Sequence, residues 1–272
     1  MDVCAKLRGI LKERRIGHGG TLDPMATGVL PVFVGSATKA VEFAEKGDKE
    51  YVAGLRLGMV TNTQDSTGEV LETRSVSLGR GELEAVLPRF TGPIAQIPPM
   101  YSAIKVQGKK LYQLARKGQE VERKPRPVTI HALELLEQAA PDRFLLRVRC
   151  SKGTYVRTLC HDIGQALGCG GCMDELRRTM AAGFTLADAV TLEQVQAQGE
   201  ALLMPVDCLF TGCPVFLLTS PRAEKLVRCG SPIPAPGLQP GQYRVYSQEK
   251  EFLCLSRWEQ GQLRSVKNFF GG

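Results

Sequence analysis

The run from Gly17 to Pro31, GHGGTLDPMATGVLP, constrains the fold more than any other segment of the chain. It holds four glycines and two prolines in fifteen residues. A helix or strand cannot continue through it, because glycine is conformationally permissive and proline lacks a backbone donor. Pro24 also favours an extended backbone at Asp23. We therefore expect a loop that holds the Asp23 carboxylate in place, with the ring of His18 able to reach the same cavity.

The local pattern of this run leaves two interpretations open. Asp-Pro in a glycine-rich stretch is also the ordinary composition of a turn. A fixed carboxylate beside an aromatic heterocycle instead favours chemistry on a flat, polar substrate. An apolar strand candidate, residues 29–34, follows at once.

The length of 272 residues allows one large domain, or a large domain with a small one. A hydrophobic content of 43% suffices for a core. Residues 1–15 are charged and amphipathic, unlike a signal peptide, and no apolar run is long enough to cross a bilayer. We expect a soluble, cytoplasmic protein.

The net charge of +7 is concentrated in residues 105–127, where eight basic side chains stand against two acidic ones. Tyr101 and Tyr112 flank or interrupt this basic segment. Basic residues mixed with aromatic ones suit a phosphate backbone with unstacked bases. A solvated charged face is the alternative, but the concentration of charge favours a nucleic-acid partner.

The nine cysteines are scattered, and their odd number does not indicate a disulfide framework. Cys169 and Cys172 have the CxxC spacing, but Cys208 and Cys213 are the only plausible second pair and lie farther apart. Structural zinc prefers tighter, repeated pairs. We interpret the cysteines as small apolar residues and expect no metal site among them.

Hydrophobic periodicity predicts an irregular alternation of helices and strands, which indicates an α+β fold with a mixed or antiparallel sheet. Asp65, Asp162 and Asp174 are interpreted as loop or helix-surface acids without a chemical role. Ser36 is a candidate helix cap. The predicted helices span residues 3–11, 36–45, 81–90 and 154–167, and the predicted strands span 51–57, 128–136 and 143–150.

Beyond residue 205 the composition changes, and proline and glycine become frequent between short apolar runs. These runs are residues 215–218, 243–246 and 252–255. They predict a small, mostly β module, near the lower size limit for independent folding.

Several segments together resemble the TruB family of tRNA pseudouridine synthases, over residues 1–205. The run GHGGTLDPMATGVLPVFVGSATK is specific to that family. The other matching segments are DKEY at residues 48–51, PMYSAIK at 99–105, GKK at 108–110 with Tyr112, and SKGTYVRT at 151–158. The last module, residues 206–272, resembles the family's PUA RNA-binding domain through its order and size.

The resemblance implies a pseudouridine-synthase catalytic domain over residues 1–205, with an RNA-clamping insertion at about 98–127. We predict that this insertion is mobile in the free protein. The implied enzyme is an isomerase that detaches uracil from its ribose and rejoins it through carbon, without metal or cofactor. The implied substrate is the T-loop uridine of tRNA, the partner is the T stem-loop, and a monomer suits the family.

The resemblance also implies the roles of individual residues. Asp23 matches the catalytic nucleophile, and Arg157 matches the arginine that pairs with it, as a bidentate guanidinium can. Tyr51 matches the tyrosine that stacks on the flipped base and can take part in proton transfer. Further matches are His18, which fills the space left by the flipped base, Tyr155 and Leu176, which line the uracil pocket, and Lys39, which faces RNA phosphate.

Leu176 could equally be a simple core residue, Tyr51 an ordinary strand residue, and Arg157 a phosphate or surface contact.

Family members normally begin with a strand and a Lys-Pro-x-Gly-x-Thr-Ser motif, which would precede Asp2. Our hypothesis is that Met1 is an internal methionine taken for the start, or that the gene is truncated. The loss of that strand would expose a sheet edge.

Two other classes of function compete with the isomerase. An RNA-binding or tRNA-folding protein without turnover would share the RNA affinity, and the missing strand favours it. A metal- or nucleotide-dependent enzyme has little support, because the chain has no P-loop and only three histidines.

Overall fold

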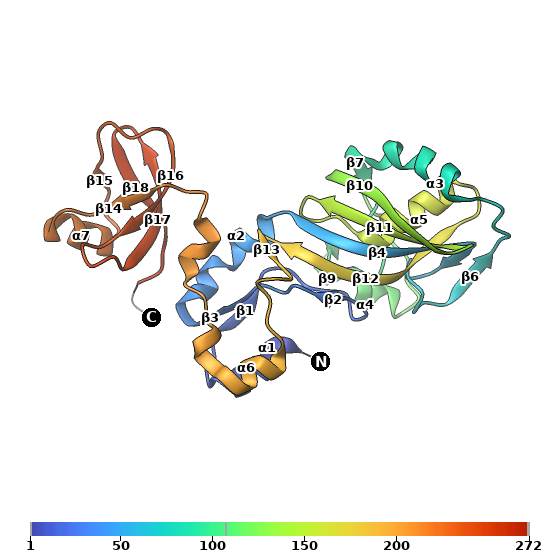
Figure 1. The fold of residues 1–272 in the computed structure, drawn as a ribbon, viewed down its shortest axis with the longest axis horizontal. Helices are drawn as coiled ribbons and strands as arrows, with labels where there is room; N and C mark the ends of the chain where they lie inside the picture. Colours follow the sequence, from blue (N-terminus) through green and yellow to red (C-terminus); the bar gives the residue numbers. More distant parts are fainter. Residues whose placement is uncertain (1, 107, 271–272) are drawn as a thin grey trace. The chain divides into compact units, whose positions relative to one another are not determined.

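The computed structural model describes residues 2–106 and 108–270, and the chain divides into two compact units (Figure 1). The first unit comprises Met1–Thr21, Leu30–Glu45 and Asp188–Gly272, and the second comprises Leu22–Val29 and Lys46–Ala187. Helices and a mixed sheet alternate irregularly, which confirms the predicted α+β class. The division at residue 205 between a catalytic and a PUA-like domain stays a prediction.

The second unit is built on a seven-stranded sheet in the order β13-β12-β4-β11-β10-β7, with β2 joined to β12. Every pairing in it is antiparallel except the parallel β2–β12 pair. The strands are β2 (Thr27–Gly28), β4 (Lys49–Leu57), β7 (Gly92–Gln96), β10 (Arg126–Ala140), β11 (Arg143–Cys150), β12 (Gly171–Ala181) and β13 (Phe184–Thr185).

One face of this sheet packs against helices. The helices are α3 (Arg80–Val86), η2 (Leu87–Phe90) and α5 (Val156–Ala166), and they share one apolar core with the strands (Figure 1). The inward residues of β4 alternate along the strand, so Ala53, Leu55 and Leu57 lie in the core while Arg56 is exposed. This period of two is why residues 51–57 could be predicted as a strand.

Helix α5 approaches strand β12 very closely. A Cβ built on Gly164 would lie 2.2 Å from the backbone nitrogen of Gly171, so only glycine fits at this crossing. The contact fixes the last turn of the helix relative to the sheet. Strand β12 itself has no counterpart among the predicted elements.

The connections of the second unit carry small hairpins. Strands β5 (Met59–Thr61) and β6 (Val70–Thr73) flank a turn that contains Asp65. The basic insertion contains β8 (Lys105–Val106), β9 (Lys109–Lys110) and α4 (Leu111–Ala115), with Met100, Leu111 and Leu114 as its own small core. Its predicted mobility stays a prediction.

The first unit begins with α1 (Val3–Leu11), as the helical spacing predicts, and Asp2 caps it by accepting from the N–H groups of Cys4 and Ala5. It continues with β1 (Ile16–His18), β3 (Val32–Val34), η1 (Gly35–Ala40) and α2 (Val41–Lys46). The predicted helix from Ser36 is therefore a 3-10 turn followed by a short α-helix, with Val34 rather than Ser36 at its N-cap. The predicted strand over 29–34 shortens to Val32–Val34, because Pro31 cannot donate to a ladder.

The last part of the first unit is a five-stranded sheet in the order β14-β16-β17-β18-β15, which confirms a mostly β module. Tyr243, Val245, Leu253 and Leu263 lie in its core. The predicted strands correspond to β14, β16 and β17, whereas the helices of this region were not predicted. The elements are α6 (Leu192–Gln198), η3 (Gly199–Leu202), η4 (Val206–Phe210), β14 (Val215–Leu217), α7 (Pro221–Arg228), β15 (Ile233–Pro234), β16 (Gly241–Tyr246), β17 (Phe252–Glu259) and β18 (Gln262–Asn268).

Candidate active site

The loop that carries Asp23 is fastened to strand β12. Asp23 opens a turn in which its carbonyl accepts from the N–H of Ala26, at 2.9 Å. Residues Thr27 and Gly28 then pair in parallel with Arg177 and Arg178. Gly28 has a φ of +100°, and a Cβ there would lie 2.1 Å from the Arg178 carbonyl oxygen. Only glycine permits this approach, so the sequence holds Asp23 at a fixed place beside the sheet.

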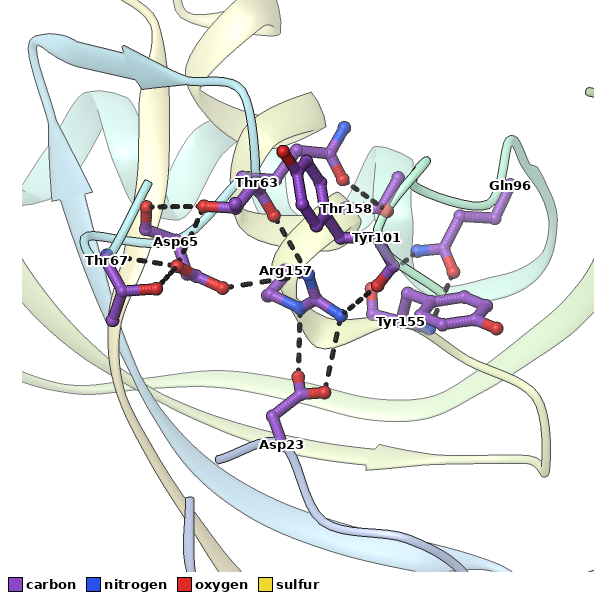
Figure 2. A network of polar contacts seen from close by, with 10 residues as sticks. Asp23, Thr63, Asp65, Thr67, Gln96, Tyr101, Tyr155, Arg157 and Thr158 are labelled. Carbon is purple, nitrogen blue, oxygen red and sulfur yellow. Dashed lines mark hydrogen bonds and ion pairs between the residues drawn. The ribbon is translucent and has the colours of Figure 1, made fainter. Parts of the chain in front are cut away.

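The Asp23 carboxylate forms a bidentate ion pair with Arg157, in the first turn of α5 (Figure 2). Nε of Arg157 lies 2.9 Å from Asp23 Oδ2, and Nη2 lies 3.3 Å from Oδ1. The Arg157 side chain is 7% exposed, whereas that of Asp23 is 34% exposed. A buried cation therefore orients a carboxylate whose outer side is open to solvent. The predicted pairing of these two residues is confirmed.

The remaining donors of Arg157 are bound by two loops (Figure 2). Nη1 donates to the carbonyl of Thr63 at 3.0 Å, and Nη2 donates to the carbonyl of Tyr101 at 3.0 Å. Tyr101 opens the basic insertion, so the guanidinium connects this insertion to the Asp23 carboxylate. A planar fork of five donors can satisfy all these acceptors at once, and a lysine cannot.

Asp65 is a second carboxylate beside Arg157. It lies in a loop, as predicted, but it is buried there and not at the surface. It is 7% exposed, and Oδ2 lies 3.6 Å from Arg157 Nη1. Oδ1 accepts from the hydroxyls of Thr63, at 2.9 Å, and Thr67, at 2.6 Å, and from the Thr67 N–H, at 3.0 Å. The spacing Thr-x-Asp-x-Thr is the signal that could have indicated a carboxylate bound by its own turn.

The two other acids that were given no role lie elsewhere. Asp162 is on α5, and burial raises the pKa of its carboxyl to about 6. Asp174 is on β12 and forms an ion pair with Arg143, at 2.6 Å.

Tyr51 lies on β4 and packs against the apolar core. Burial raises the pKa of its phenol, and the nearby Arg178 guanidinium opposes this shift through charge and a hydrogen bond. The Asp23 carboxylate also raises the pKa of Tyr51. Tyr51 therefore stays protonated at neutral pH, within the electrostatic reach of Asp23.

Arg178 was given no role, yet it contacts both the loop that carries Asp23 and the side chain of Tyr51. It is 1% exposed, and its Nε donates to the carbonyl of Val29 at 2.7 Å. Its own carbonyl accepts from the N–H of Val29 at 2.9 Å. Through these bonds it closes the Asp23 loop, while its guanidinium contacts Tyr51. An arginine at an inward position of a strand is the signal, but that strand was not predicted.

Tyr155 occupies the N-cap position of α5, next to the ion pair (Figure 2). Burial raises the pKa of its phenol, and the charges of Arg157 and Asp23 also act on it. Asp23, Arg157, Tyr51 and Tyr155 therefore come together, as predicted, from four separate segments of the second unit. Their chemical roles stay predictions.

The other predicted site residues have different surroundings. Leu176 is 5% exposed in the apolar core, so it contributes to core packing, and its place in a uracil pocket stays a prediction. His18 is the last residue of β1, half-buried, and Lys39 is exposed in η1. Both belong to the first unit, and their predicted contacts with RNA stay predictions.

The cysteines of the CxxC sequence lie in the core. Cys169 is 6% exposed and Cys172 0% exposed, and burial raises the pKa of the Cys172 thiol to about 11. Among the described residues, no group of three or more His, Cys, Asp or Glu side chains is arranged to hold a metal ion. In the same part of the chain, no helix is long and apolar enough to span a membrane.

The arrangement suits nucleophilic chemistry on a flat substrate. A carboxylate that is oriented by a buried guanidinium and has about one third of its side chain exposed can attack an electrophilic carbon. Two phenols beside it offer aromatic faces on which an extruded base can stack. Because both phenols resist ionisation, they add no negative charge that would compete with the carboxylate.

Comparison with known proteins gives two matching family models that adjoin each other. The model described as "TruB family pseudouridylate synthase (N terminal domain)" matches residues 8–156. The model described as "tRNA pseudouridylate synthase B C-terminal domain" matches residues 157–211. The boundary between them falls next to Arg157.

Similar curated proteins carry one name, tRNA pseudouridine synthase B. The one from Pseudomonas putida is 49% identical, over 92% of this chain and 84% of its own length. Those from Cupriavidus metallidurans and Clostridium kluyveri are 44% and 40% identical, over 97% and 98% of this chain and 88% and 94% of theirs.

A solved structure shares the fold across nearly the whole chain. It is titled "Crystal Structure of a Cbf5-Nop10-Gar1 Complex", and the matched chain is 26% identical, with a TM-score of 0.75. The match covers 99% of this chain and 80% of that one. On the family models and the curated relatives together, this chain belongs to the TruB family of pseudouridylate synthases.

Proposed function

We propose that this chain is a tRNA pseudouridine synthase that isomerises the T-loop uridine of tRNA. In this reaction the bond between ribose C1′ and uracil N1 breaks, and a bond between C1′ and C5 forms. C5 loses its hydrogen as a proton, and N1 gains one, so the balance needs no oxidant, metal or cofactor. The names of the similar proteins and the family models support this assignment.

Asp23 is the proposed nucleophile, and one observation carries the proposal. The Asp23 carboxylate is held at two points by Arg157, while one third of its side chain stays exposed. The ion pair directs the oxygens and leaves room for a substrate. Its attack on ribose C1′ and its attack on the uracil ring are both compatible with this geometry, and both give a covalent adduct through the carboxylate.

Tyr51 and Tyr155 are proposed to receive the flipped base. A uridine in a folded loop must leave its stack before it can reach Asp23. An aromatic platform returns about 1–3 kcal/mol per stacked base, which offsets much of the unstacking cost. Because burial keeps the Tyr51 phenol protonated, its hydroxyl can also donate a hydrogen bond to a uracil oxygen or share in proton transfer.

The proposed partner is the T stem-loop of tRNA. The eight basic residues of the segment 105–127 supply charge for the RNA backbone. We further propose the roles given above for His18, Leu176 and Lys39, a monomeric state, a cytoplasmic location and a PUA-like RNA-binding domain over residues 206–272.

The test uses an unmodified tRNA transcript and maps pseudouridine by position. Wild-type protein should convert the T-loop uridine, and Asp23→Asn should bind the same transcript without converting it. A transcript whose T-loop uridine is replaced by cytidine controls for position. Binding by both proteins with no product from either would overturn the isomerase and leave an RNA-binding protein.

A further inference from the structure

The side chain of Gln96 is bound at both ends by the backbone of one residue. Gln96 is the last residue of β7, and it is 2% exposed. Its Oε1 accepts from the N–H of Tyr155 at 2.8 Å, and its Nε2 donates to the carbonyl of Tyr155 at 3.0 Å (Figure 2). A buried carboxamide needs such partners. The Gln96 carboxamide binds both the N–H and the C=O of Tyr155, 59 positions away in the chain. Two residues in an antiparallel strand pair exchange the same two kinds of hydrogen bond through their backbones.

These two bonds fix the backbone at the point where α5 begins. Tyr155 has φ −101° and ψ 106°, which is extended, and the helix starts at Val156. The same Tyr155 carbonyl also accepts the first helical bond, from the N–H of Leu159 at 3.0 Å. The direction of the Tyr155 ring therefore depends on the carboxamide of Gln96.

The sheet forms without this side chain. The backbone of Gln96 pairs with Arg126 in the β7–β10 ladder, so the carboxamide is free to reach from the sheet to the helix start. The ring that it directs stands near the reacting groups, since the charges of Arg157 and Asp23 both act on the Tyr155 phenol.

We propose that Gln96 is a positioning residue of the isomerisation, which holds Tyr155 against the target base through the Tyr155 backbone without touching the RNA. The proposal rests on the proposed function. It predicts a slower chemical step with unchanged RNA affinity, because Gln96 is buried and makes none of the proposed RNA contacts.

The test compares Gln96→Met with wild type under single-turnover conditions, with a T stem-loop RNA tritiated at uridine C5. Methionine keeps the length of the side chain but neither hydrogen bond. Since misplacement by about 1 Å can cost about 100-fold in rate, we expect a loss of about 10- to 100-fold in tritium release. The Kd for the RNA should stay within about twofold, because no proposed RNA contact is removed.

Two comparisons separate positioning from general destabilisation. Leu135→Ala, which truncates a partly buried β10 side chain packed against the core of the second unit, should lower the melting temperature without changing the rate. In a Tyr155→Leu background, Gln96→Met should change the rate by less than about twofold, because the ring that it directs is gone. Gln96→Glu keeps the acceptor for the Tyr155 N–H, so it should lose less activity than Gln96→Met. If Gln96→Met does not fold, Gln96→Glu is measured in its place.

A Gln96→Met rate equal to that of Leu135→Ala would overturn the proposal. The proposal would also be overturned if the double variant lost the product of the two single-variant rate losses. A Gln96→Met effect confined to the Kd for the RNA would overturn it as well. If wild-type protein makes no pseudouridine, the proposed function itself fails, and this result is visible before any Gln96 variant is measured.

Discussion

Replacing Gly28 with alanine should disable the site without altering any group that touches substrate. The new Cβ would lie 2.1 Å from the Arg178 carbonyl oxygen, whereas packed atoms need about 3 Å or more. Strand β2 must therefore move by about 1 Å away from β12, and the turn that carries Asp23 moves with it. A shift of this size at reacting groups costs about 100-fold in rate.

The same change also costs stability. The φ of +100° strains any residue with a Cβ by about 1–3 kcal/mol, and a weakened Val29–Arg178 hydrogen bond adds about 0.5–1.5 kcal/mol. We expect the free energy of unfolding to fall by roughly 2–4 kcal/mol in a denaturant titration.

Gly183→Ala is the matched control. Gly183 has a φ of +89°, but apart from Gly183 and its two chain neighbours no described residue has an atom within 4 Å of a Cβ built there. It carries the same kind of backbone strain without the clash. Tritium release from the labelled RNA should therefore fall about 100-fold for Gly28→Ala and less than about threefold for Gly183→Ala. Equal rates for the two variants would refute the argument that close packing at Gly28 holds Asp23.

Three further changes have distinct expected outcomes. Arg157→Lys should lower the single-turnover rate at least about 100-fold at unchanged RNA affinity, because one ammonium cannot pair bidentately with Asp23; a loss below tenfold would contradict this. Asp65→Asn should cost about tenfold in the same assay, since an amide donor would then face the guanidinium; wild-type rate would show that this carboxylate is dispensable. Burial raises the pKa of the Cys150 thiol from 9.0 to about 11. As the pH rises, this thiol is therefore deprotonated in the unfolded state before it is deprotonated in the folded state. Stability should then fall by roughly 2–3 kcal/mol between pH 9 and 11, and Cys150→Ala should remove this share of the slope in denaturant titrations at stepped pH.

The parts of the fold that could be predicted are those with a recognisable local period or turn signal. Residues 3–11 show a clear helical spacing, and the pair over 126–150 is joined by a short Pro-Asp turn. Both elements form where the periodicity indicates, although the β10–β11 pair itself contains register shifts.

Strand β12 could not be predicted, although it carries Leu176 and Arg178 and adjoins β4. It begins with a glycine, Gly171, and has register shifts between Met173 and Glu175 and between Arg178 and Met180. Each bulge moves the following side chains to the other face, so the alternation that identifies a strand is lost.

In the candidate site, too, some residues could be predicted from the sequence and others could not. Asp23 could be identified because its loop is a contiguous run with unusual composition. The contacts of Arg157 join residues up to 134 positions apart, so the local pattern around Asp65 could not reveal its ion pair with Arg157. Gln96 and the Nε–H of Arg178 bind backbone groups, which the types of the surrounding residues do not reveal.

The central claim is that Asp23 acts as a nucleophile held by Arg157, and one measurement tests it most directly. Single-turnover formation of pseudouridine in a T stem-loop RNA is compared for wild type and Asp23→Asn, with the Kd of each measured on the same RNA. The account predicts conversion by the wild type, a rate for Asp23→Asn below about 10⁻⁴ of it, and equal affinities. Conversion by Asp23→Asn within about tenfold of wild type would contradict the account, because the carboxylate would then not be the reacting group.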